Sequence, residues 1–191
     1  YVSLNKNDNN GTQIWSYSDG SLVPVTDSSS VGTNFSPSNL FSLNNKLYFT
    51  ASDDVNGTEI RTLDDNNLSQ IIQTNIFTKD SSPSNFISFN GKVIFTANTP
   101  EYGTELYESN GTNISLVSDI YSGSGSSSPS NFIEYNGKLY FTANDPNYGN
   151  ELRVYDGTSV SLVQDLDIGV TSSNIAYLII YDNKLYFRAQ Y

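Results

Sequence analysis

The sequence contains no cysteine, histidine or methionine in its 191 residues. Without cysteine there is no disulfide framework and no thiolate metal site. Without histidine the commonest general base and transition-metal ligand is missing, which excludes Ser-His-Asp and Cys-His catalysis. A chain without oxidisable sulfur suits a long-lived protein outside the cell, so we expect an extracellular location.

Charged residues and long apolar runs are also scarce. Charged residues make up 15% of the chain, with 20 acidic against 9 basic residues and a formal net charge of −11. This charge repels phosphates and anionic lipids, so we expect no nucleic-acid partner and no basic membrane-binding patch. No apolar run approaches the ~18 residues of a membrane span, so we expect no membrane insertion. Because the chain has no initiator methionine or signal peptide, Tyr1 is expected to begin a processed or excised chain.

One segment recurs along the whole chain. A clear copy reads Asn-Gly-Lys-Leu-Tyr-Phe-Thr-Ala at 136–143, followed by Gly-Asn-Glu-Leu at 149–152. Equivalent residues are 46 positions apart, as at Lys46, Lys92, Lys138 and Lys184 and at Gly11, Gly57, Gly103 and Gly149. A fixed period of this length indicates a repeat architecture. We therefore expect a single repeat domain over 1–191, with repeats at 1–46, 47–92, 93–138 and 139–184, and with 185–191 starting a fifth copy.

Each repeat carries four short strand signals. In the third repeat they fall at 86–89, 92–97, 104–109 and 114–119. The first two are separated by Asn90-Gly91, which is the strongest short-range hairpin signal. No stretch of the chain has helical periodicity. The sequence therefore predicts an all-β fold in which each repeat is a meander of four antiparallel strands.

The longest connection leads from the fourth strand of one repeat to the first strand of the next. It ends in Ser-Pro-Ser-Asn at 36–39, 82–85 and 128–131. A Gly/Ser-rich link is typical of a flexible linker, but a flexible linker has no reason to keep a motif in register. A crossing from the outer edge of one sheet to the inner edge of the next explains the motif better. This favours a β-propeller of four four-stranded blades.

The two ends of the chain are expected to share the closing blade. By the repeat spacing, 1–4 is a second strand without a first, whereas 177–181 and 185–191 are a first and a second strand. A mixed N/C-terminal blade would close the ring and leave one terminal strand surplus. An exposed edge strand is a template for another chain, so a subunit-pairing strand is expected. Its residues are Leu185, Tyr186, Phe187 and Tyr191.

Two segments resemble the bacterial ELWxxDGT repeat. They are Glu-Leu-Tyr-Glu-Ser-Asn-Gly-Thr at 105–112 and Glu-Leu-Arg-Val-Tyr-Asp-Gly-Thr at 151–158, and the resemblance covers essentially the whole chain in four copies. The tryptophan position of the repeat holds Trp15, Arg61, Tyr107 and Arg153. Such repeats occur in secreted or surface-attached bacterial proteins with a propeller-like architecture and no settled activity. The resemblance therefore implies a bacterial extracellular or cell-surface location and a propeller-like fold.

Carboxylates recur at Glu59, Glu105 and Glu151, each just after a glycine turn. A pair of carboxylates can hydrolyse glycosides, but the two need different environments to separate their pKa values. Residues repeated once per blade occupy equivalent environments. We expect these glutamates to accept hydrogen bonds from backbone N–H groups at the turn, and we expect the chain not to be an enzyme.

A second set of carboxylates, Asp27, Asp119 and Asp165, ends the fourth strands beside crossings rich in carbonyl oxygens. Oxygen ligands suit Ca²⁺, which makes calcium the candidate cofactor. The alternative is that these aspartates cap turns through their own backbone.

The variable position of the repeat is the candidate contact site. Trp15, Arg61, Tyr107 and Arg153 share one register but differ in type, so we expect them to face solvent, a protein partner or a glycan. The sequence as a whole predicts an extracellular structural or adhesive module. Its expected partner is another copy or another surface protein, and strand sharing between neighbours would build a head-to-tail filament. The alternative is a glycan-binding, lectin-like propeller with sites between blades.

Overall fold

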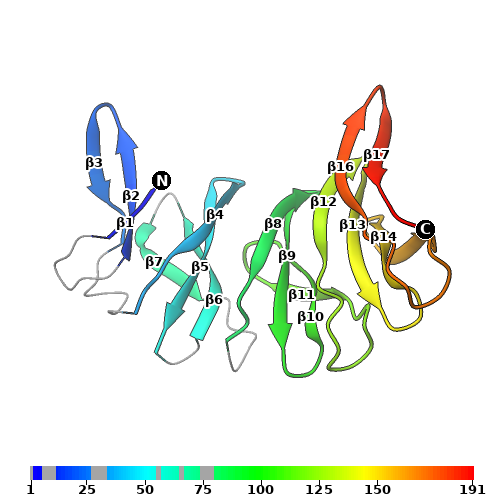
Figure 1. Cartoon of the computed structure of the whole chain (residues 1–191). Helices are drawn as coiled ribbons and strands as arrows, with labels where there is room; N and C mark the ends of the chain where they lie inside the picture. Colours follow the sequence, from blue (N-terminus) through cyan, green and yellow to red (C-terminus); the bar gives the residue numbers. More distant parts are fainter. Residues whose placement is uncertain (1, 6–11, 27–33, 55–56, 65–66, 74–79) are drawn as a thin grey trace.

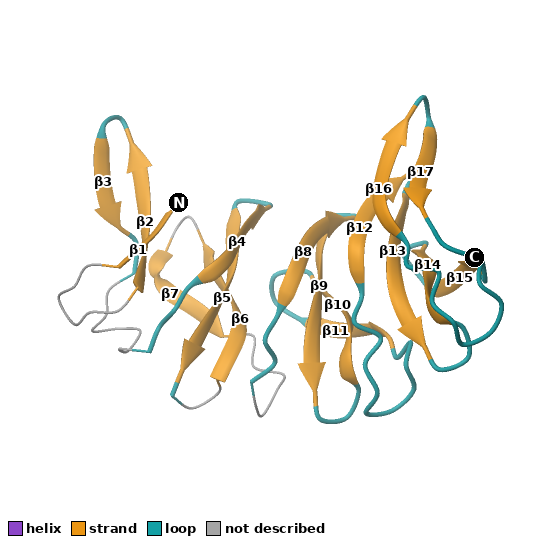
Figure 2. Ribbon diagram, viewed as in Figure 1, coloured by secondary structure: helices purple, strands orange, loops and turns teal. Residues whose placement is uncertain are grey.

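The computed structural model describes residues 2–5, 12–26, 34–54, 57–64, 67–73 and 80–191 (Figure 1). In this part of the chain every regular element is a β-strand, and the strands form five antiparallel sheets (Figure 2). The described residues include no helix that is long and apolar enough to cross a lipid bilayer. The prediction of an all-β fold is therefore confirmed.

The sheets follow one another in chain order. Sheet 1 holds β1 (Val2–Asn5), β2 (Thr12–Ser18) and β3 (Ser21–Pro24). Sheet 2 holds β4 (Ser38–Leu43), β5 (Lys46–Asp53), β6 (Gly57–Asp64) and β7 (Asn67–Gln73). Sheet 3 holds β8 (Ser84–Phe89), β9 (Lys92–Thr99), β10 (Gly103–Ser109) and β11 (Ile114–Ser118). Sheet 4 holds β12 (Ser130–Tyr135), β13 (Lys138–Asp145), β14 (Gly149–Tyr155) and β15 (Val160–Gln164), and sheet 5 holds β16 (Ala176–Tyr181) and β17 (Lys184–Arg188).

The strands repeat with the period found in the sequence. The second strand of sheets 2 to 5 begins at Lys46, Lys92, Lys138 and Lys184. The turn before it contains two residues with positive φ, for example Asn90 at 49° and Gly91 at 73°. Two positive φ angles in succession are what a type I′ hairpin requires, and asparagine and glycine adopt them most readily. Local turn chemistry therefore sets the start of each hairpin.

The sheets are arranged in an arc, with sheet 1 at one end and sheet 5 at the other (Figure 1). Their first strands are neighbours in the order β4, β8, β12 and β16. The long crossings thus lead from the outer edge of one sheet to the inner edge of the next, as the Ser-Pro-Ser-Asn motif predicted.

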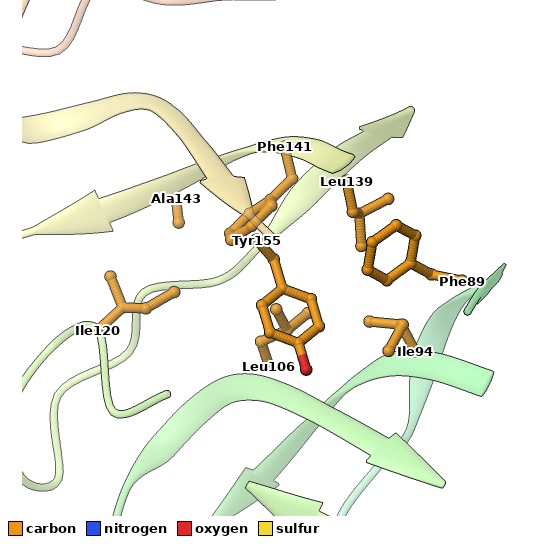
Figure 3. Close-up of a cluster of buried hydrophobic side chains, with 8 residues drawn as sticks. All are labelled: Phe89, Ile94, Leu106, Ile120, Leu139, Phe141, Ala143 and Tyr155. Carbon is orange, nitrogen blue, oxygen red and sulfur yellow. The ribbon is translucent and has the colours of Figure 1, made fainter. Parts of the chain in front are cut away.

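The hydrophobic core lies between successive sheets. We call the face that carries Phe49, Phe95 and Phe141 the back face, and the opposite face, with Tyr48 and Ile94, the front face. Because strand residues alternate between faces, each sheet offers one set of side chains to each neighbour. The front face of sheet 2 packs on the back face of sheet 3 through Tyr48, Ile60, Val93, Phe95, Ala97, Tyr107 and Ile114. The front face of sheet 3 packs on the back face of sheet 4 through Phe89, Ile94, Leu106, Leu139, Phe141, Ala143 and Tyr155 (Figure 3).

The expected closing blade is absent from the described residues. β1 shares a sheet with β2 and β3, whereas β16 pairs with β17, with Ile180 opposite Leu185. The prediction of a mixed blade built from both ends is therefore wrong for this structure. The physical reason is competition, because β17 occupies the edge of β16 that β1 would need. The five sheets form an open arc, with sheets of two, three and four strands.

Candidate functional site

The front face of sheet 5 is an exposed apolar surface. Tyr181 and Tyr186 are 72% and 45% exposed, and their rings lie 6.2 Å apart between centroids. The residues at the same repeat positions in sheet 3, Phe89 and Ile94, are only 2% and 0% exposed. Ile179, also on this face, is 60% exposed. Sheet 5 therefore presents the kind of surface that the interior sheets bury against their next neighbour.

The back face of sheet 1 is exposed in a complementary way. Tyr17 is 68% exposed, whereas Tyr155, at the same repeat position of sheet 4, is 4% exposed because it packs on sheet 3. Leu22 is 54% exposed, whereas its counterpart Ile114 is 8% exposed. One end of the arc thus exposes a front face and the other exposes a back face.

Sheet 5 also differs from the other sheets at the start of its first strand. In sheet 4, Asn131 has a φ of 56° and its Nδ2 donates to the Oγ1 of Thr142 at 3.0 Å. In sheet 5 these two positions hold Tyr177 and Arg188, and the guanidinium carbon lies 5.0 Å from the centroid of the tyrosine ring. Tyr177 is 74% exposed with a φ of 60°, which is unfavourable for a bulky side chain. The 46-residue spacing aligns Tyr177 with Asn131 and Arg188 with Thr142, so these changes of residue type were present in the sequence, but they were not among the predicted site residues.

The predicted subunit-pairing strand lies in this sheet. Leu185 is half-buried, and Phe187 on the same face is 37% exposed, whereas Tyr186 belongs to the front face. Tyr191 follows the end of β17 and is fully exposed. In the described residues β17 pairs with β16 alone, so its other edge is available.

The predicted contact position is buried in the interior sheets. Arg61 and Arg153 are each 7% exposed, and each forms an ion pair with an aspartate on the second strand of its own sheet. The guanidinium nitrogen of Arg61 lies 2.5 Å from a carboxylate oxygen of Asp53, and that of Arg153 lies 3.0 Å from one of Asp145. Burial of an arginine requires such a partner.

Tyr107 and Trp15 complete the set at this position. Tyr107 is 3% exposed, and its hydroxyl lies 3.4 Å from the Oγ1 of Thr99, the counterpart of Asp53. Trp15, in the end sheet, is half-buried. The expectation that this position faces solvent is therefore wrong for Arg61, Tyr107 and Arg153, because it lies on the back face that the preceding sheet covers.

The repeated glutamates accept hydrogen bonds from the crossings that connect one sheet to the next. Glu105 is fully buried and accepts hydrogen bonds from the backbone N–H groups of Ile120, Tyr121 and Ser127 at 3.0–3.1 Å. It also accepts one from the hydroxyl of Ser127 at 2.5 Å. The glutamates accept hydrogen bonds from backbone N–H groups as expected, but these groups belong to the crossing after the fourth strand, so the glycine turn was the wrong place for them. The same pairing joins Glu59 to Ser81 and Glu151 to Ser173.

Burial changes the protonation of these carboxyl groups. Burial raises the pKa of Glu59 from its ordinary value of 4.5 to about 7, and the hydrogen bonds from Ser81 oppose the rise. Burial also raises the pKa of Glu105. Sheet 1 has no carboxyl group here, because Gln13 stands at this position and accepts a hydrogen bond from Thr26 at 2.8 Å. The chain thus contains its own neutral counterpart of the buried glutamates.

Two of the three candidate calcium ligands lie in the described residues. One carboxylate oxygen of Asp119 accepts a hydrogen bond from the N–H of Gly123 at 3.1 Å, and Asp165 does the same with Gly169 at 3.0 Å. The other oxygen of each is buried and has no hydrogen-bond partner among the described residues. The described part of the chain contains no group of three or more acidic, histidine or cysteine residues that could hold a metal. Asp27 lies outside the described residues.

Comparison with known proteins shows a similarity to a solved structure. No family model matches the chain, and no curated protein matches it. The structure is similar to that of Pyrococcus horikoshii acylaminoacyl peptidase in an orthorhombic crystal form, with a TM-score of 0.57 and 16% sequence identity. The similarity covers 87% of this chain but 25% of the peptidase, so the chain spans about a quarter of that protein's length. At this identity the similarity shows the fold alone.

This similarity overturns the prediction that the chain is not an enzyme. That prediction relied on the lack of histidine and on the equivalence of the repeated glutamates. A similar arrangement of sheets forms part of a hydrolase chain. Neither feature of these 191 residues is therefore a ground for excluding an enzyme.

Proposed function

We propose that the chain is an extracellular structural or adhesive module of the ELWxxDGT-repeat type whose copies associate end to end. In this proposal sheet 5 at the end of one copy meets sheet 1 at the start of the next, and the association covers the apolar face that each of these sheets exposes. The two faces differ, so the contact is heterologous, and a heterologous contact that does not close continues into a filament.

One observation carries the proposal. The hydrophobic clusters between the described sheets join the front face of one sheet to the back face of the next, as sheet 2 joins sheet 3 and sheet 3 joins sheet 4. At the two ends of the arc, sheet 5 leaves a front face exposed and sheet 1 leaves a back face exposed. Tyr181 on sheet 5 and Tyr17 on sheet 1 are both exposed by about 70%. Burying apolar surface of this kind stabilises association by roughly 25 cal/mol per Å² before the entropy of binding is subtracted.

Several properties support a place outside the cell. The chain combines no cysteine or methionine with a low content of charged residues. The repeat segments resemble those of secreted and surface-attached bacterial proteins, and the proposed location rests on this resemblance. The proposed partner is a second copy of the chain or another surface protein.

Light scattering over a range of concentrations tests the association. We expect a mass that increases with concentration, and we expect the double variant Ile179→Ser/Tyr181→Ser to keep the mass of one chain. The matched control is Tyr148→Ser, which removes an exposed tyrosine from the turn after β13 and should assemble like the unmodified chain. Unchanged assembly after deletion of 185–191, or a single-chain mass at all concentrations, would remove the proposal.

A second candidate function, glycan binding, is favoured by the aromatic side chains of sheet 5. Tyr177, Tyr181 and Tyr186 are exposed on β16 and β17, and exposed aromatic rings can stack on sugars. An array of glycans tests this candidate, with Tyr177→Ser as the comparison. If the unmodified chain binds none of the glycans on the array, glycan binding is contradicted.

A further inference from the structure

The inner sheets define a fixed pairing between second and third strands. Phe49 lies opposite Arg61, Phe95 opposite Tyr107, and Phe141 opposite Arg153. β17 is the second strand of sheet 5, and Phe187 occupies the same repeat position. In the described residues no third strand lies beside β17. A hollow lined by Asp167, Asn174, Ala189 and Tyr191 lies near its end.

In sheet 1, β2 corresponds by repeat spacing to the third strands β6, β10 and β14. Its partner β1 does not pair with it in the register that the inner sheets share. The repeat spacing would place Ser3 opposite Trp15 of β2, but Val2 lies there instead. A shift of one residue along a strand exchanges the residues on its two faces. β1 therefore pairs with β2 in a register that none of the interior second strands uses.

The residue types explain this difference. In the interior second strands the back face carries Leu or Val, then Phe, then Ala, as at Leu139, Phe141 and Ala143, which are all 0% exposed. β17 and the residue after it continue the pattern with Leu185, Phe187 and Ala189, whereas positions 1, 3 and 5 hold Tyr, Ser and Asn. By sequence, β17 is the better partner for β2.

We infer that β17 of one copy pairs with β2 of a second copy, in place of β1, to form one four-stranded sheet in the order β16-β17-β2-β3. This inference rests on the proposed end-to-end association and specifies its register. Phe187 then lies opposite Trp15, Leu185 opposite Tyr17, and Ala189 opposite Gln13. The edge of β17 supplies unpaired backbone groups, which is how a strand is added to a sheet.

The added strand also accounts for the exposed side chains. Tyr17 takes the position that Tyr155 has in sheet 4, where the ring lies 5.6 Å from that of Phe89 on the preceding sheet. The counterpart of Phe89 in sheet 4 is Tyr135, so Tyr17 of the second copy covers Tyr135. The occupant is a second copy because sheets 1 and 5 of the same chain lie at opposite ends of the arc (Figure 1).

The lack of cysteine makes this register directly testable by disulfide trapping. A tagged Tyr17→Cys variant is mixed with an untagged Leu185→Cys variant under mild oxidation, and the mixed disulfide dimer is separated by mass. The control replaces Leu185→Cys by Tyr186→Cys, which is one residue out of register and on the opposite face. We expect about tenfold more mixed dimer from the matched pair, since a disulfide needs Cβ atoms about 3.5–4.5 Å apart.

A second matched pair, Trp15→Cys with Phe187→Cys, repeats the test in case one variant does not fold. Equal mixed dimer from matched and control pairs overturns the inference. A disulfide within one chain in the double variant Tyr17→Cys/Leu185→Cys also overturns it, because the occupant would then be the chain's own sheet 1. If light scattering shows that the unmodified chain associates, but the matched cysteine pairs give no more mixed dimer than the control pair, the inferred strand register is wrong and the proposed function stands. If it does not associate at all, both fail.

Discussion

Tyr17 and Tyr155 occupy the same repeat position, yet Tyr17 is 68% exposed and Tyr155 is 4% exposed. The hydroxyl of Tyr155 donates to a carboxylate oxygen of Glu108 at 3.1 Å, and burial, with the Glu108 carboxylate, raises the pKa of Tyr155 to about 12. The difference lies in the neighbouring sheet: sheet 3 packs on sheet 4, whereas in the part of the chain that the structure describes no sheet covers the back face of sheet 1. The pair therefore reports directly on what contact with a preceding sheet contributes.

We predict that truncating these two tyrosines has unequal effects. Tyr155→Ala removes a buried ring and should lower the free energy of unfolding by about 3–5 kcal/mol. Tyr17→Ala should change it by no more than about 0.5 kcal/mol in dilute solution, as for an exposed side chain. Denaturant unfolding measures both. Equal losses would mean that Tyr17 is already covered in the single chain.

The buried carboxyl of Glu59 should make stability depend on pH. Its pKa is about 7 in the folded chain and ordinarily 4.5, so the folded state binds the proton more tightly. Its contribution is therefore most favourable below pH 4.5, declines as the pH rises from 4.5 to 7, and is constant above. Glu59→Gln, which copies the natural Gln13, should flatten this part of the profile.

Thermal unfolding of both proteins between pH 4.5 and 8 measures this effect. Asp156→Asn provides a comparison, because hydrogen bonds from the backbone of Ser159 and Thr158 lower the pKa of that exposed carboxyl. Its loss should therefore leave the decline between pH 4.5 and 7 in place. An identical decline in Glu59→Gln would assign the pH dependence to other groups.

The asparagines that begin the first strands should be sensitive to substitution. Asn85 has a φ of 57°, and its Nδ2 donates to the carbonyl oxygen of Pro129 at 3.4 Å, which links sheets 3 and 4. Asn85→Ala combines an unfavourable backbone angle with the loss of this hydrogen bond and of a second one, to the Oγ1 of Thr96 at 3.3 Å, and should cost about 1–2 kcal/mol. The control is Asn113→Ala, an exposed turn position. Similar costs for the two variants would show that the backbone angle does not matter.

Calcium binding at the crossings is predicted to raise the unfolding temperature. The unpartnered buried oxygens of Asp119 and Asp165 would each gain a cation, at the millimolar affinity typical of sites outside cells. Thermal unfolding with calcium and with EDTA measures the effect, and the variant Asp119→Asn/Asp165→Asn should abolish it. A midpoint unaffected by EDTA in the unmodified chain would show that calcium does not stabilise the fold.

Salt should promote the proposed association. Each copy carries a net charge of −11, so two copies repel each other, and the proposed contact is mostly apolar. Raising the ionic strength from about 0.01 to about 0.15 M shortens the screening length from about 30 to about 8 Å. The mass from light scattering should increase accordingly. A decrease with salt would indicate that ion pairs hold the copies together.

The features of the fold that follow from local chemistry could be read from the sequence. The period of 46, the Asn-Gly turns and the four strands of the inner repeats depend on residues close together in the chain, and the structure has them. The burial of Arg61 could not be read in this way. It depends on Asp53, which lies in the neighbouring strand, and on a back face that another sheet covers.

The end of the arc was predictable only in part. The sequence showed that the strands at 1–4 and 185–191 compete for the same place beside β16. Which of them takes it depends on the packing of whole strands, and the structure has β17 there. The exposed pair Tyr177 and Arg188 was visible as a break in the repeat, but its stacking required the paired strands.

The contacts between neighbouring sheets are nearly the same from one pair to the next. Ile60, Phe95 and Ala97 join sheets 2 and 3, and the residues at the same repeat positions, Leu106, Phe141 and Ala143, join sheets 3 and 4. A gene segment coding for 46 residues could therefore be duplicated or lost without creating an unmatched junction. Evolution can lengthen or shorten such an array in whole units, because each new unit arrives with both of its adhesive sides already formed.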